Sequence, residues 1–413
     1  MVSPRHGATE AAPRRSQAVA VVVALSVALF ALNTVETLPV GLLPTIARDL
    51  AVSEGAVGRL VTGYGIVVAV MSVPLTYLVR RIPRRSLLLV LLSLFVLATA
   101  AGGAAPSYGI LLVSRLAVAL THAVYWSIAA ATAAGLFPPE VRGRVIAGLF
   151  SGLSLASVVG VPVGTWLGQQ LNWRVPFFTM SALGFLALLA IAVLLPARAV
   201  QDSHASRGAQ PSALRFAVLM VAVALVVTGI FTVFTYITVV LTQVTGLSEQ
   251  ATAPVLLAAG IAGFLGTSAA GFLADRHAQL SMILAVGLTA ATLIALFALG
   301  HIPTAAVIVV MCLTFSMSAM TTSLQNRILL VAPGSTEVAS AAGSSIFNVG
   351  IASGSLIGSV LLDGGVRTNV LVGAGLAIAA LVVLLSEPLW VARRAPAPTT
   401  TVTATRSHDR ALV

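Results

Sequence analysis

Twelve runs of apolar residues follow one another along this 413-residue chain, with short polar breaks between them. A helix needs about 20 apolar residues to cross a bilayer. A soluble fold is excluded, because 58% of the side chains are apolar and only 8% are charged, whereas soluble domains carry about a quarter charged residues. We therefore expect an all-α membrane protein with twelve transmembrane helices. The expected spans are 19–46, 57–79, 86–104, 109–136, 145–169, 175–196, 215–243, 252–274, 279–300, 303–328, 337–363 and 369–391.

The 23 basic residues are all arginines, and their placement indicates an orientation. With the N-terminus inside, 18 of them fall in inner segments, four in outer segments and Arg115 within a span. Because basic residues concentrate in cytoplasmic loops, we expect a multi-pass protein of the bacterial inner (cell) membrane with both termini cytoplasmic. The net charge of +11 comes from the arginines of these loops. We therefore expect the lipid bilayer as a partner and do not expect nucleic acid.

One long polar interruption, residues 198–215, divides the spans into six and six. The six-span halves are also related in sequence: VTGYGIVVAVMSVPLTYLVRR aligns without a gap to LLAAGIAGFLGTSAAGFLADR, pairing Gly65 with Gly260 and Arg81 with Arg276. Repeated halves in one orientation are a known transporter design, with the substrate bound between them near the bilayer midplane. The expected parts are an N-terminal tail (1–18), an N-terminal half (19–197), a cytoplasmic linker (198–214), a C-terminal half (215–391) and a disordered tail (392–413).

Four stretches give the chain a resemblance to a known family. They are TVETLPVGLLPTIARDLAVSEGAVGRLVTGYGIVVAV in spans 1 and 2, SRLAVALTHAVYW in span 4, SGLSLASVVGVPVGTWLGQQLNWRVPFF in spans 5 and 6, and GIFTVFTYITVVLTQVTGLSE in span 7. Over roughly residues 18 to 392 the chain resembles twelve-span drug:proton antiporters of the major facilitator superfamily, and within them the sugar-efflux and chloramphenicol-resistance-like exporters. The resemblance implies two six-helix halves that alternate access to a central site.

Glu36 is the acidic residue that the membrane tolerates least, since a carboxylate deep in a span costs about 2.5–3.5 kcal/mol. The other eleven acidic residues fall in tails, in loops or near span ends. At 1.5 Å per helical residue, Glu36, Arg115 and His122 lie about 15, 9 and 20 Å below the expected outer surface. Arg115, His122 and Trp126 share one helical face.

With spans 1 and 4 as neighbours, as the resemblance implies, these depths favour a proton-coupling site of Glu36, Arg115 and His122. Burial raises the pKa of a carboxyl group and a nearby guanidinium lowers it, so a rearrangement that changes these distances would load or release a proton. The resemblance also associates the span-4 arginine with proton coupling. The alternatives are that Glu36 is a structural partner of Arg115 or binds backbone at the Pro39 kink, that Arg115 is an interhelical clamp, and that His122 is a hydrogen-bonded core histidine.

Aromatic side chains within the spans, together with a few amides and hydroxyls, are the candidate substrate contacts, because such groups suit a moderately apolar, neutral or cationic ligand. Helix packing is the alternative for each of them. The candidates are Asn33, Tyr64, Trp126, Phe231, Phe234, Thr235, Tyr236, Gln325 and Asn348.

Two motifs indicate moving parts. Gly160, Pro162, Gly164 and Gly168 in span 5 permit close helix approach and a kink, and they resemble the antiporter motif of exporters, with a packing surface as the alternative. The second motif is a cytoplasmic-loop latch of the family. Its pattern Gly-x-x-x-Asp-Arg is complete in the second half at Gly271, Asp275 and Arg276, whereas Thr76 and Arg80 replace Gly and Asp in the first half, and Arg81, Arg84 and Arg85 follow as expected anchors to anionic lipid.

We expect a monomeric, proton-coupled exporter of small organic compounds such as drugs or sugars. The proton gradient takes the place of a cofactor, and no metal site is expected. An enzyme is disfavoured because the sequence has no acid pair, metal-ligand cluster or nucleophile–base constellation, and its six histidines are scattered. The alternatives are a proton-coupled uptake symporter, a channel and a non-transporting membrane sensor.

Overall fold

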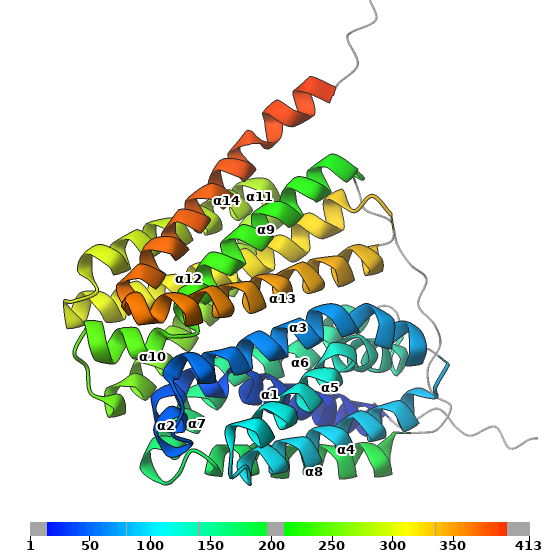
Figure 1. Ribbon diagram of the computed structural model, residues 1–413. Coiled ribbons are helices and arrows are strands. Elements are labelled where there is room, and N and C mark those ends of the chain that lie inside the picture. Colours follow the sequence, from blue (N-terminus) through cyan, green and yellow to red (C-terminus); the bar gives the residue numbers. More distant parts are fainter. Residues whose placement is uncertain (1–14, 80, 139–140, 196–209, 335, 395–413) are drawn as a thin grey trace, which may run out of the picture.

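The computed structural model describes residues 15–79, 81–138, 141–195, 210–334 and 336–394, and these residues fold almost wholly into helices (Figure 1). Twelve helical stretches among them are long and apolar enough to cross a membrane. The first half comprises α1 (Arg15–Gly41), α2 (Leu43–Asp49), α3 (Glu54–Val79), α4 (Arg84–Gly103), α5 (Tyr108–Gly135), α6 (Arg142–Leu155), the π-helical turn η2 (Ala156–Gly160), α7 (Val161–Gln170) and α8 (Val175–Leu194).

The second half comprises α9 (Ala213–Phe234), α10 (Ile237–Val239), the π-helical turn η3 (Val240–Val244), α11 (Glu249–Leu299), α12 (Pro303–Val331), α13 (Thr336–Leu361), the short η4 (Leu362–Gly364) and α14 (Val366–Arg394). Each half forms one bundle, and the two bundles lie side by side in Figure 1. Within the first, α4 packs against α5 and α8, and within the second, α9 packs against α13 and α14. The bundles meet mainly along α3 and α13.

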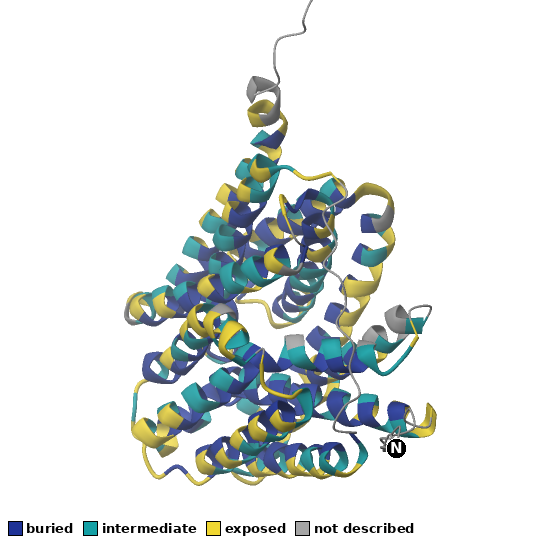
Figure 2. Cartoon of the chain, turned by 90° about the vertical axis from the view of Figure 1, so that its right-hand side faces the viewer, coloured by how far each residue is buried: buried dark blue, intermediate teal, exposed yellow. Residues whose placement is uncertain are grey.

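The outward faces of both bundles are apolar. Large side chains such as Leu78, Val193 and Phe272 are each more than 70% exposed, and exposed residues cover the outer surfaces of the helices in Figure 2. Such a surface suits hydrocarbon and not water. The expected all-α membrane fold with twelve spans in two halves is therefore confirmed.

Four expected spans have a different local course. Span 1 breaks at Leu42, and the short α2 restarts with Pro44 in its first turn, where proline needs no hydrogen-bond donor. Span 7 breaks at Tyr236, between α9 and α10. Spans 8 and 9 both lie within α11, which consists of two helices joined at a kink where the backbone of His277 is not helical. Hydropathy sets the length of an apolar run but not the backbone breaks within it.

The hydrogen bonds between the halves, within the described residues, gather at the end of the molecule where α1 ends and α3 begins, which we name the closed end. There Ser355 and Ser359 of α13 donate hydroxyl hydrogen bonds to the carbonyls of Gly58 and Gly55 of α3, at 2.7 and 3.1 Å. A Cβ atom added at Gly58 would overlap the hydroxyl of Tyr236. Small residues thus let the two bundles touch backbone to backbone.

A polar layer covers this glycine–serine seam. Arg48 forms an ion pair with Glu249 of the other half, with Nη2 2.6 Å from Oε2. Gln169 donates from Nε2 to the main-chain carbonyl of Glu249 (2.9 Å) and to Thr252 Oγ1 (2.8 Å). The pairing with Glu249 raises the pKa of the Arg48 guanidinium above its ordinary value. Opening the closed end therefore requires these bonds to break together.

The loop corner beside this layer is fixed by Asp49. Trp173 Nε1 and Arg174 Nη1 donate to Asp49 Oδ2 at 2.9 and 2.6 Å. These two hydrogen bonds, that from Trp173 foremost, hold the pKa of the Asp49 carboxyl below its ordinary value. A group with a lowered folded-state pKa stabilises the fold above its unfolded pKa, and the stabilisation is lost as the pH falls.

Substituting leucine for Gly58 is expected to open the closed end, because the side chain has no room beside Tyr236. The measurement is the distance between spin labels at the exposed Ala104 and His301, one in each half, in a Cys312→Ala background. Gly58→Leu should lengthen the distance distribution. Gly109→Leu is the matched control, since an added Cβ at Gly109 meets nothing within 4 Å. If wild type and Gly58→Leu gave the same distribution of distances between the two spin labels, close packing at Gly58 would not be what holds the closed end shut.

Replacing Asp49 by asparagine is expected to lower the thermal unfolding midpoint in detergent by about 1–2 °C at pH 7, a small effect because the carboxylate is partly exposed. The difference should begin to shrink as the pH falls below about 4, where the unfolded chain is protonated first, and should vanish once the folded-state carboxyl of Asp49 is protonated as well. A difference between the two proteins that is the same at both pH values would show that ionisation of Asp49 contributes nothing.

Candidate functional site

The site begins with a gap in the hydrogen bonding of α1. Pro39 lies inside this helix and has no backbone N–H to donate to the carbonyl of Val35, four residues earlier. An unpaired carbonyl in the middle of a membrane helix is costly, since no water is there to bind it. The sequence NTVETLP therefore places a free acceptor one residue before Glu36.

Arg115 of α5 fills this gap. Its Nη1 donates to the Val35 carbonyl at 2.5 Å, and its Nη2 donates to the Glu36 carbonyl at 2.8 Å. Only 1% of the residue is exposed, and its guanidinium carbon lies 4.8 Å from the ring centre of Tyr64. Arg115 thus clamps the α1 backbone at the kink, and these bonds go to main-chain oxygens and not to the Glu36 carboxylate.

The Glu36 carboxylate points instead toward His122, one and a half to two helical turns along α5 from Arg115. Glu36 Oε2 lies 3.2 Å from His122 Nδ1. The side chain of Glu36 is 21% exposed, so a water-sized molecule has access to it, whereas that of His122 is 10% exposed. The sequence left open whether Glu36 pairs with Arg115, with backbone near Pro39 or with His122. In the structure its carboxylate lies beside His122.

Tyr64 of α3 reaches the same histidine nitrogen. Its hydroxyl lies 2.6 Å from His122 Nδ1, and the residue is 2% exposed. Trp126, one turn after His122, stacks on the imidazole with the ring centres 5.7 Å apart and 5° between the planes. Phe150 of α6 continues this aromatic group at 5.5 Å from Trp126. Three helices, α1, α3 and α5, thus meet at one imidazole.

The second half supplies aromatic residues of its own. Phe231 lies edge to face with Phe234 and with Phe347, at 5.9 and 6.4 Å between ring centres. Asn348 is buried and donates within its helix to the Ser344 carbonyl at 3.0 Å.

Other expected substrate contacts lie in different surroundings. Tyr236 belongs to the seam of the closed end, where its hydroxyl donates to the Ser355 carbonyl at 3.0 Å. Thr235 is buried, and among the described residues its hydroxyl has no hydrogen-bond partner. Gln325 is exposed and Asn33 half-buried. The carbonyl of Asn33 accepts a hydrogen bond from Thr37 at 3.2 Å.

The glycines of span 5 hold the helix that carries Glu36. An added Cβ would overlap Thr34 at Gly160, Leu38 at Gly164 and Leu42 at Gly168, so the three glycines face successive turns of span 1, up to the break at Leu42. Pro162 lies in the first turn of α7, directly after the π-helical turn η2. The motif therefore lets α7 pack closely on α1, and the distortion of span 5 lies just before the proline.

The loop motif is described only in part, because Arg80 and the side chain of Asp275 lie outside the described residues. Arg84 and Arg85 donate to carbonyls near the ends of α5 and α8, at 3.1 Å (Ala131) and 2.6 Å (Ala192). Arg81 is exposed. Near Gly271, the guanidinium of Arg276 lies 5.2 Å from the ring centre of Phe272.

A buried carboxylate was missed by sequence reasoning. Glu387 is 3% exposed and accepts two hydrogen bonds from Arg327 Nη2, at 2.7 and 2.8 Å, with Arg215 Nε at 3.8 Å. Its position near a span end made it look like an interfacial group. One sequence signal could have revealed the cluster. Arg215, Arg327 and Glu387 all fall at the expected cytoplasmic ends of their spans, 7, 10 and 12.

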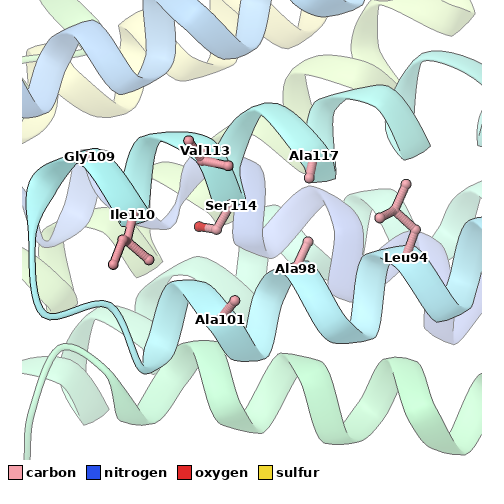
Figure 3. A pocket seen from close by; sticks show the side chains of 8 residues that line it. All are labelled: Leu94, Ala98, Ala101, Gly109, Ile110, Val113, Ser114 and Ala117. Atoms are coloured by element: carbon pink, nitrogen blue, oxygen red, sulfur yellow. The ribbon is translucent and has the colours of Figure 1, made fainter.

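An apolar hollow of about 370 Å³ lies elsewhere, between α4 and α5 (Figure 3). Its lining consists of Leu94, Ala98, Ala101, Gly109, Ile110, Val113, Ser114 and Ala117. Ile110 and Val113 are 47% and 67% exposed, so the hollow opens on the outward, lipid-facing side of the bundle. We do not assign it to the site around Glu36.

Comparison with known proteins agrees with this architecture. The family model described as Major Facilitator Superfamily matches residues 25–354. Crystal structures of a bacterial homolog to the human lysosomal transporter Spinster, inward-facing and unoccupied or occupied, have TM-scores of 0.71 and 0.72, with 15% and 16% identity, 93% of this chain covered and 100% of theirs. The human organic anion transporter MFSD10 (TETRAN) has a TM-score of 0.64 at 16% identity, with 90% and 99% covered.

Removing the Arg115 donors is expected to cost more stability while Pro39 leaves the Val35 carbonyl free than when this proline is replaced. Arg115→Met should destabilise the protein by about 1–3 kcal/mol, the cost of a buried unpaired group. Pro39→Ala restores the N–H and should stabilise the Arg115→Met protein by about 1 kcal/mol more than it stabilises wild type. Thermal unfolding of the four proteins in detergent measures this coupling.

Pro74→Ala is the matched control, because Pro74 lies inside another membrane helix, α3. Its effect should be the same with and without Arg115. Strict additivity of Arg115→Met and Pro39→Ala would contradict the clamp.

Proposed function

The chain belongs to the major facilitator superfamily, and we propose that it is a proton-coupled exporter of small organic compounds that works by alternating access. The observation that carries the proposal is the pairing of Glu36 with His122 inside the membrane-spanning part of the first half. A transporter driven by protons needs a group that takes up and releases a proton within the membrane. A carboxylate beside an imidazole is such a group, since both titrate.

The cost of the site supports a role in coupling. Placing a carboxylate in a span costs about 2.5–3.5 kcal/mol, and Arg115 is not used to neutralise it but holds the backbone. The carboxylate keeps a fifth of its side-chain surface accessible. It is thus held firmly by its backbone while its acidic group stays within reach of water.

The distribution of contacts between the halves supports alternating access. The seam and its polar layer close one end, and by the arginine distribution this end faces outward, with both termini in the cytoplasm of a bacterial cell. Separation of the seam would expose the site to the other side. Both Spinster-homolog structures are in an inward-facing conformation, which agrees with this orientation.

The aromatic groups on both halves support a small organic substrate with apolar and polar parts, such as a drug or a sugar. Trp126 and Phe150 lie in the first half, and Phe231 and Phe347 in the second. Because one structural neighbour is an organic anion transporter, a substrate panel should include anions. The transporter is expected to act as a monomer with the proton gradient as its only energy source.

Glu36→Gln is expected to abolish concentrative transport while leaving exchange intact. In proteoliposomes, flux driven by a pH gradient should fall at least about tenfold, because the amide binds no proton at these pH values; tenfold corresponds to about 1.4 kcal/mol. Exchange of labelled for unlabelled substrate at equal pH should stay near the wild-type rate. A misfolded variant would lose both activities, whereas an uncoupled variant would lose only the gradient-driven flux and keep exchange.

Glu54→Gln is the matched control, because Glu54 lies in the same half but at the closed end, 3.3 Å from Gln243. It should leave the dependence of the flux on the pH gradient unchanged. Undiminished gradient-driven transport in Glu36→Gln would contradict the proposal. Substrate movement along the proton gradient and not against it would identify an uptake symporter.

A further inference from the structure

His122 Nδ1 is shared by two groups that cannot both bind it in the same way. Tyr64 Oη lies 2.6 Å from this nitrogen and Glu36 Oε2 lies 3.2 Å from it. An imidazole nitrogen carries either one lone pair, which accepts one hydrogen bond, or one hydrogen, which it donates. The phenol and the carboxylate therefore compete for Nδ1, and the winner depends on where the protons are.

The surroundings restrict the possibilities to few groups. The charged or titratable side chains that the described structure places around His122 are Glu36 from α1, Tyr64 from α3 and Arg115 from its own helix. The Nη1 and Nη2 atoms of Arg115 donate to the carbonyls of Val35 and Glu36. The remaining event is exchange of a proton between Glu36 and His122. The Tyr64 hydroxyl beside them either donates a hydrogen bond to His122 Nδ1 or turns away from it.

We propose that Tyr64 is a positioning residue of the proton-coupling site, whose phenol closes His122 Nδ1 after His122 has passed a proton to Glu36. The inference rests on the proposed function and moves Tyr64 from the substrate contacts to the coupling machinery. In the unloaded state His122 is neutral with its hydrogen on Nδ1, and Nδ1–H donates to the ionised Glu36.

Loading then takes one proton from water. The proton binds His122 Nε2, which forms a new N–H bond there, and the imidazolium gives up its Nδ1 proton to Glu36 Oε2. The N–H bond at Nδ1 breaks and an O–H bond forms at Glu36, so one proton enters and the carboxylate becomes neutral. The hydroxyl of Tyr64 turns its hydrogen to the vacated lone pair on Nδ1 and keeps its own O–H bond.

The hydrogen bond from Tyr64 makes return of the proton by the same route unfavourable. Glu36 can give its proton back to Nδ1 only if Tyr64 turns away. The cation–π contact of Arg115 with the Tyr64 ring, at 4.8 Å, fixes the ring that carries the hydroxyl. Phenylalanine at this position keeps that ring contact and removes only the closing group, so Tyr64→Phe isolates the proposed role.

Trp126 reports on His122 directly, because the stacked imidazole quenches indole fluorescence strongly when protonated and weakly when neutral. In Tyr64→Phe, Nδ1 is free to keep a proton beside Glu36. The pH midpoint of Trp126 quenching, identified as the component lost in Trp126→Phe, should therefore rise by about half to one pH unit. Proteoliposomes of this variant without substrate should also dissipate an imposed pH gradient faster than wild type.

Tyr125→Phe is the matched control, since Tyr125 is a buried tyrosine of the same helix whose hydroxyl donates to the Leu25 carbonyl at 3.1 Å. Its quenching midpoint should equal that of wild type. In a Glu36→Gln background, Tyr64→Phe should shift the midpoint less, because the carboxylate that holds the proton at Nδ1 is gone. Size-exclusion profiles of the detergent-solubilised proteins check folding.

A midpoint in Tyr64→Phe equal to wild type would overturn the proposal, as would an equal shift with and without Glu36. The fluorescence titration requires no transport. The role of Tyr64 and the proposed function can therefore be disproved independently of each other. A wild-type protein whose flux ignores the pH gradient would contradict the proposed function, while the shift in Tyr64→Phe would still establish how Tyr64 acts on His122.

Discussion

The hydrogen bonds from Arg115 to the backbone of α1 are the interaction on which the site depends. Pro39 leaves a carbonyl without a donor in a region where water cannot supply one, and the guanidinium takes the place of the missing N–H. This satisfies a buried acceptor, keeps an arginine in the membrane without pairing it to the carboxylate, and fixes the turn that carries Glu36. The acid is consequently left to interact with His122.

The same helices connect this site to the closed end. Val40 of α1, one turn after Glu36, accepts a hydrogen bond at 3.1 Å from Thr238 of the other half. On α3, Gly58 of the seam lies fewer than two turns from Tyr64. Separation of the halves thus pulls on both helices close to the groups that hold His122. In the proposed mechanism, this mechanical link would let proton loading and the opening of the seam influence one another, as a coupled transporter requires.

Much of the architecture could be predicted from the sequence because the bilayer imposes it. Twelve apolar runs of sufficient length define the spans, and helical rise alone placed Glu36 between Arg115 and His122 in depth. Hydrogen-bond partners were harder to predict, since the choice of Arg115 between a carboxylate and a backbone carbonyl depends on angstrom-scale placement. Tyr236 looked like a substrate contact but lies in the seam, because only the folded structure shows which spans meet at Gly58. Glu387 escaped notice because its burial by Arg327 comes from a helix 60 residues away in sequence.

The central claim is that one carboxyl group, Glu36, takes up the proton that drives transport. Infrared difference spectroscopy of the protein in lipid, recorded as the pH is lowered, tests it most directly through the carbonyl-stretch band of a protonated carboxylic acid. The account predicts a band that grows as Glu36 is protonated, is absent from Glu36→Gln and diminishes when a transported substrate binds. A band of the same size in Glu36→Gln would contradict it.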